Sequence, residues 1–150
     1  MRLLLSAILL LSYSLVLSCS PGNVIPSSDE DIAEAVFRFQ IERCYETNPP
    51  KIYFLSLNSN DPTSEFIARF KPNSLVLRKR SQMSAEFTDP GSGERGIVLS
   101  VEKLTRLSET KFEVEGACVA GGLNGYGFVY SVIRERGGAW RVGSRLKWIS

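Results

Sequence analysis

Histidine is absent from the 150 residues of the chain. Its absence excludes a Ser-His-Asp or Cys-His nucleophilic centre and every metal site that depends on imidazole ligands. It also removes the side chain that most often transfers protons near neutral pH. The Gly-rich stretch 120–127 lacks the lysine and the following helix of a phosphate-binding loop, so it predicts a hairpin turn. We therefore expect no cofactor.

The chain also has no large excess of charge of either sign, with 18 basic and 16 acidic residues. Its one basic cluster is 78–80, which is too narrow for the stripe that a nucleic-acid interface needs, and we expect no nucleic-acid partner. The hydrophobic fraction of 43% and the charged fraction of 23% are ordinary for a globular protein of one domain.

A membrane-spanning run of about 18–20 apolar residues is missing as well. The leucine-rich stretch 3–17 is interrupted by three serines and follows a single cation, Arg2. This layout is typical of a secretory signal. The stretch ends in Val16-Leu17-Ser18-Cys19.

That ending resembles the lipobox of bacterial lipoproteins. The resemblance implies that residues 1–18 are a signal peptide and that Cys19 becomes the lipid-modified first residue of the mature chain. Ser20 is similar to the second residue of lipoproteins sent on to an outer membrane. We expect an exported protein anchored by lipid in the cell envelope, on the periplasmic side of an outer membrane if the source has one. Ordinary cleavage with a free Cys19 is the alternative.

Cysteine parity leads to a second expectation. If Cys19 carries lipid, Cys44 and Cys118 remain as a pair in an oxidising compartment. A disulfide between them would close a loop of about 75 residues, for which the chain-entropy model gives about 4.5 kcal/mol. Two buried free thiols are the alternative, and these two cysteines alone cannot complete a metal site.

The mature chain divides into a lipidated tether, 19–27, and a single folded domain, 28–150. A helix is predicted over 29–45, because Ser28 and Asp31 form an approximate capping box and apolar residues cover more than half of the helix circumference. Gln40 falls between its two apolar stripes, as either a satisfied core amide or a polar contact inside a cavity.

Strands are predicted over 51–58, 75–82 and 96–105, with a short helix over 61–70 capped by Asp61. From residue 112 the apolar side chains alternate, which predicts an antiparallel meander with one aromatic face. The other face would carry Glu113 and Glu115 on one edge and a basic edge, separate from them, without ion pairs between the two. Five aromatic residues share the predicted aromatic face: Tyr126, Phe128, Tyr130, Trp140 and Trp148.

This order of elements resembles the nuclear-transport-factor-2-like (cystatin-like) fold over residues 29–150. The C-terminal strands of that family often read like 130–134 and 140–142 of this chain, although its usual second N-terminal helix is missing here. The ending 146–150 is similar to that of small exported bacterial proteins of unknown function. We therefore expect an α+β domain whose two helices pack on one face of a curved antiparallel sheet.

Some members of that fold family are isomerases or dehydratases with an acid or a tyrosine in the cavity between helix and sheet. Tyr53, Tyr126 and Tyr130 are the equivalent candidates, but none has a carboxylate partner at a recognisable spacing. We expect a non-catalytic module that binds a small ligand or an envelope protein, and an enzyme is the alternative. An open apolar pocket would favour the ligand and a filled interior the protein. The candidate binding residues are Gln40, Tyr126, Tyr130, Trp140 and Trp148.

Overall fold

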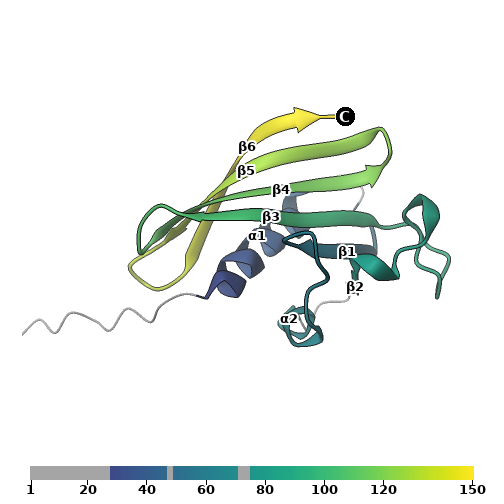
Figure 1. The fold of residues 1–150 in the computed structure, drawn as a ribbon, viewed down its shortest axis with the longest axis horizontal. Helices are drawn as coiled ribbons and strands as arrows, with labels where there is room; N and C mark the ends of the chain where they lie inside the picture. The colour runs from purple at the N-terminus through teal and green to yellow at the C-terminus, as the bar shows by residue number, and fades with distance from the viewer. Residues whose placement is uncertain (1–27, 47–48, 71–74) are drawn as a thin grey trace, which may run out of the picture.

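The computed structural model describes residues 28–46, 49–70 and 75–150. The predicted signal peptide, Cys19 and the tether lie outside the described residues. The described chain is an α+β domain in which one long helix packs on a six-stranded, open mixed sheet (Figure 1). No helix within the described ranges is both long and apolar enough to span a membrane.

Helix α1 (Asp29–Arg43) begins where the sequence predicts. The Ser28 Oγ accepts from the Asp31 N–H at 3.2 Å, and the Asp31 carboxylate accepts from the Ser28 N–H at 3.2 Å, which completes the capping box. On the solvent side Arg38 donates to Glu34 at 2.8 Å. The buried side of the helix carries Ile32, Ala33, Val36, Phe37 and Gln40.

The sheet has the strand order β2-β1-β3-β4-β5-β6, so β6 is an edge strand (Figure 1). The meander predicted from residue 112 onward is confirmed as β4 to β6, and β3 extends it by pairing antiparallel with β4. The strands in chain order are β1 (Ile52–Leu57), β2 (Val76–Lys79), β3 (Ile97–Arg106), β4 (Lys111–Gly121), β5 (Asn124–Arg134) and β6 (Trp140–Ile149).

The expectation of a wholly antiparallel sheet is wrong for its first half, because β1 pairs parallel with both β2 and β3. Parallel pairing requires a long connection that returns the chain to the same end of the sheet. Helix α2 (Ser64–Ala68) lies in the first such connection, and two short 3₁₀ turns, η1 (Arg80–Gln82) and η2 (Ala85–Phe87), lie in the second. Almost continuous burial along β1 is typical of a strand in a parallel arrangement.

Helix α2 begins later than predicted. Thr63 caps it, with its Oγ1 accepting from the Phe66 N–H at 3.1 Å. Asp61 accepts instead from the Ser81 N–H at 3.0 Å, where the chain leaves β2 and turns into η1. Asp61 is therefore not the cap of α2, and β2 does not extend to residue 82 as predicted. The hydrogen bond between Asp61 and Ser81 holds the chain in a turn there instead.

The main core lies between the helices and the sheet. Phe66 of α2 packs edge-on against Phe37 of α1, with ring centroids 6.0 Å apart, and this contact joins the two helices. A smaller cluster on the opposite face, around Phe54 and Val98, lies under Met83 and Phe87 from the second connection. Both faces of β1 are therefore covered, whereas β6 borders solvent.

Candidate functional site

Gln40 joins α1 to the middle of the sheet. Its side chain is fully buried, and its Nε2 donates to the Ser100 carbonyl of β3 at 3.1 Å and to the Tyr130 hydroxyl of β5 at 3.0 Å. Glycine at position 116 leaves room for Gln40 to reach the Ser100 carbonyl. A Cβ at Gly116 would lie 2.2 Å from that carbonyl oxygen. Gln40 is thus the core amide of the two sequence interpretations, although its Oε1 has no partner among the described residues.

Tyr130 is buried beside Gln40. Burial raises the pKa of its hydroxyl to about 12, even though the hydrogen bond from Gln40 acts in the opposite direction. The group therefore stays protonated at neutral pH. The side chain that donates to this hydroxyl is an amide and not a carboxylic acid, so the pair is suited to fixing the helix on the sheet.

A hollow of about 620 Å³ lies beyond Tyr130, between the C-terminal half of α1 and strands β5 and β6. Ring contacts connect its walls. Phe39 meets Tyr130 edge-on at 6.0 Å, and Tyr45 meets Tyr126 at 6.2 Å. The hollow is lined by Phe39, Arg43, Cys44, Tyr45, Glu46, Tyr126, Phe128, Tyr130 and Ser144.

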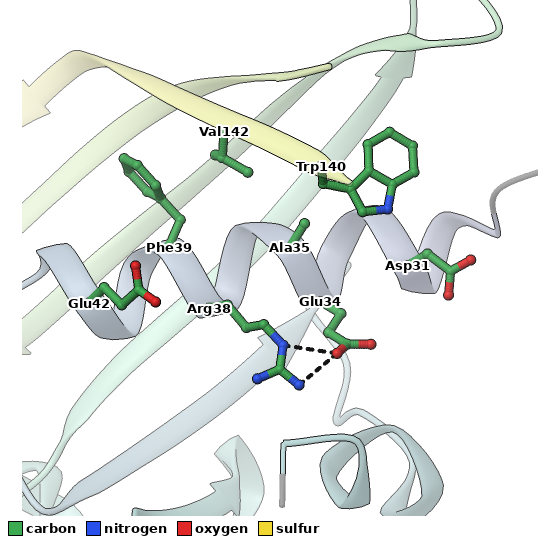
Figure 2. A pocket seen from close by; sticks show the side chains of 8 residues that line it. All are labelled: Asp31, Glu34, Ala35, Arg38, Phe39, Glu42, Trp140 and Val142. Carbon is green, nitrogen blue, oxygen red and sulfur yellow. Dashed lines mark hydrogen bonds and ion pairs between the residues drawn. The ribbon is translucent and has the colours of Figure 1, made fainter. Parts of the chain in front are cut away.

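A second hollow of about 470 Å³ lies between α1, from Asp31 to Glu42, and the start of β6. In Figure 2 Ala35 and Phe39 point from the helix toward Trp140 and Val142, while Glu34 and Arg38 extend from the other side of the helix and pair with each other. Phe39 borders both hollows, so together they form one open trough along α1. We call this trough the α1–β6 groove.

Trp140 borders the groove as a half-buried residue. Its ring packs edge-on against Phe112 with centroids 5.8 Å apart, and the Arg134 guanidinium lies 5.6 Å from the ring centre. One part of the indole is therefore core, and the other lines the second hollow. Tyr126 and Trp140 thus both border the groove, at opposite ends.

Trp148 lies on the other side of the sheet. Adjacent residues of β5 pair with residues two apart on β6, Gly127 with Trp148 and Phe128 with Leu146, so Lys147 is an extra residue in a bulge. The indole covers Gly127, where a Cβ would lie 2.0 Å from its Nε1. The expected shared face with Tyr126 is therefore wrong for Trp148, because the bulge reverses the alternation.

The expected separation of charges on that outer face is also wrong. Lys147 forms an ion pair with Glu115 across β5, and this pair holds the pKa of the Glu115 carboxyl below its usual value. Arg141 pairs with Glu135 at 3.1 Å.

The structure brings Cys44 and Cys118 to disulfide distance, with α-carbons 6.5 Å apart, as cysteine parity predicts. Cys44 is the C-cap of α1 and lines the larger hollow. The link between α1 and β4 therefore fixes the end of the helix that forms one wall of the groove.

The sequence did not identify Tyr45 and Ser144 as groove residues. Tyr45 follows the end of α1 with a φ of 64°, a conformation that no local pattern predicts for tyrosine. Ser144 is a small polar residue within an alternating strand and has no signal of its own. Phe39 was missed as well, because it reads as an ordinary apolar helix position.

The groove can offer aromatic faces, tyrosine hydroxyls and charged side chains to a bound molecule. The described residues contain no cluster of three or more acidic, cysteine or histidine side chains able to hold a metal ion. No protein-family model, curated protein or solved structure matches the chain. The lipobox and the nuclear-transport-factor-2-like resemblance therefore stay predictions.

Proposed function

We propose that the protein is a lipid-anchored envelope protein whose folded domain is a non-catalytic binding module, with the α1–β6 groove as its binding site. The observation that supports this proposal best is the open aromatic groove beside a filled interior. Gln40 and Tyr130 already complete the packing under the helix, so Phe39, Tyr126 and Trp140 border more hollow space than the core requires. Aromatic rings with a few polar groups are typical of binding sites.

The form of the groove indicates what it can accept. The interior beneath the helix is filled, and the two hollows open along the edge of the sheet. Such a trough suits an elongated ligand or a segment of an envelope protein better than a small compact molecule. The two hollows together also extend along several turns of α1.

A pair of matched variants tests the site. Ser144→Arg places a long side chain in the larger hollow, whereas Ser131→Arg makes the same change at an exposed position on the opposite face of β5. We expect the wild type and Ser131→Arg to retain the same molecules from an envelope extract, and Ser144→Arg to lose them. Equal retention by all three folded proteins would place the binding surface elsewhere.

The lipid anchor has a separate test. Cys19→Ser removes the thiol that would carry the lipid. We expect the variant to leave the membrane fraction, because stable anchoring needs two or more acyl chains. If it is processed and sediments with membranes like the wild type, the lipoprotein proposal is wrong.

A further inference from the structure

The outer edge of β6 is unpaired in the part of the chain that the structure describes. The strand is 10 residues long and hydrogen-bonds to β5 on one side only. A free edge of this kind exposes a row of backbone N–H and C=O groups. Extended peptides add to such edges as a further strand, and pockets for alternate side chains give the specificity.

The α1–β6 groove lies where the side chains of an added strand would point. Trp140 and Val142 of β6 border one hollow, and Ser144 borders the other. These residues alternate along β6, so inward positions recur at about 6.6 Å, twice the rise of a strand residue. An added strand would project every second side chain toward α1, on either side of Phe39.

The balance of charge differs between the two sides of this edge. Arg141 and Arg145 alternate with the groove residues and therefore face the outer side, and Arg145 has no ion pair with a described residue. On the inner side, α1 lines the groove with side chains of both signs. Glu34 is paired with Arg38 (Figure 2), and Glu46 is paired with Arg43. Asp31 and Glu42 are the other acidic residues of α1 in this lining. Acidic side chains are thus favoured outward beside the arginines, and less so inward, where the acidic residues of the lining outnumber the two arginines.

A second copy of this chain fits the edge poorly. Its own β6 would bring the same outward cations, Arg141 and Arg145, against those of the first copy. Like charges on neighbouring strands are destabilising. Charge complementarity therefore favours a partner of another composition.

We propose that the β6 edge binds an extended peptide segment of a protein partner, in which apolar and acidic residues alternate. The segment pairs with β6 as a seventh strand, its apolar side chains enter the α1–β6 groove, and its acidic side chains lie beside Arg141 and Arg145. This inference rests on the proposed function and specifies the occupant of the same groove.

The probe is a synthetic peptide of alternating valine and glutamate, added to the purified full chain in detergent. We expect saturable binding, slower hydrogen exchange at the backbone amides of β6, and weaker binding as salt rises. One control peptide has the same composition with the valines and glutamates in two blocks. Another carries N-methyl groups on alternate peptide nitrogens, which removes strand hydrogen bonds. Both are expected to bind at least about tenfold more weakly.

A charge exchange tests the orientation. Arg145→Glu should lower the affinity for the valine–glutamate peptide by about tenfold and raise the affinity for a valine–lysine peptide. The matched variant Arg136→Glu, in the exposed turn before β6, makes the same change of charge away from the edge and should alter both affinities by less than about twofold. Circular dichroism of the two variants confirms that they fold.

Several results would overturn the inference. They are absence of binding at millimolar peptide, binding without protection of β6, and equal effects of the two charge variants. Protection of β6 by phosphatidylglycerol vesicles but not by the peptide would assign the edge to a lipid surface, and a β6-protected dimer would assign it to a second copy. If the peptide fails while Ser144→Arg still abolishes retention of envelope molecules, the groove stands as a binding site and only this occupant is wrong.

Discussion

Gln40 is the residue on which the position of α1 over the sheet most depends. Its Nε2 bonds to β3 and β5 at once, through the Ser100 carbonyl and the Tyr130 hydroxyl, at a place where Gly116 leaves room for it. A buried amide of this kind stabilises one arrangement of helix and sheet over others, because its partners are buried with it. The arrangement also sets the width of the groove.

Replacing Gln40 with leucine keeps the size of the side chain and removes these hydrogen bonds. We expect Gln40→Leu to lower the free energy of unfolding by about 1–3 kcal/mol, because the Ser100 carbonyl and the Tyr130 hydroxyl stay buried without this donor. Tyr130→Phe should lower the free energy of unfolding by less, since Gln40 still donates its hydrogen bond to the Ser100 carbonyl. Urea unfolding measures both, and a Gln40→Leu protein as stable as the wild type would show that the amide does not hold the helix.

A second single residue, Asp89, is expected to make the stability of the domain depend on pH. Its carboxylate accepts from the Ser92 Oγ at 2.9 Å and the Ser92 N–H at 3.1 Å, and Arg78 lies at 3.4 Å. These contacts hold the pKa of Asp89 below its ordinary value of 3.8, although burial acts in the opposite direction. A lowered carboxyl pKa adds stability that is complete above that ordinary value and is lost as pH falls through the lowered pKa.

We therefore expect the wild-type free energy of unfolding to fall below about pH 4, and Asp89→Asn to fall less steeply over the same range. Unfolding curves at closely spaced pH values, from neutral to strongly acidic, give the two slopes. Parallel slopes would show that Asp89 does not contribute to the acid sensitivity of the domain.

At the scale of the elements, the C-terminal end of α1 is fixed by its proximity to β4. Cys44 ends the helix and lies at disulfide distance from Cys118, while Tyr45, the next residue, forms part of the groove wall. A bond between the cysteines would hold the helix end and this wall in place together.

A disulfide here predicts a loss of stability on reduction. We expect reductant, or the double change Cys44→Ser with Cys118→Ser, to lower the free energy of unfolding by about 2–4 kcal/mol. The measurement is urea unfolding of the exported protein with and without reductant. Two free thiols by mass spectrometry after alkylation, or identical unfolding curves, would contradict the bond.

The elements also show which features a sequence can predict. Periodicity and capping placed α1 and the strands of the meander correctly, because those signals lie within a few neighbouring residues. The facing of Trp148 was not predictable, since a single extra residue, Lys147, reverses the alternation and bulges depend on the partner strand. Parallel pairing of β1 was missed for a similar reason, as alternation is the same for both directions of pairing.

Across the whole molecule, burial is uneven. The parallel half of the sheet is covered on both faces, whereas the antiparallel half ends at an uncovered edge strand beside the groove. The core could be predicted from apolar positions, but the groove could not, because Tyr45 and Ser144 come together with β5 only in the folded chain. The free edge, the groove and the aromatic lining coincide, and for this reason we propose this side of the domain as its binding side.

The central claim is that the groove, and not the opposite face of the sheet, contacts the bound molecule. The most direct measurement places a photo-crosslinking amino acid at Ser144 or, in a second protein, at Ser131, and irradiates the cells that make the protein. We predict a covalent adduct from position 144 and none from position 131. An adduct from position 131 alone, or from neither position, would contradict the claim.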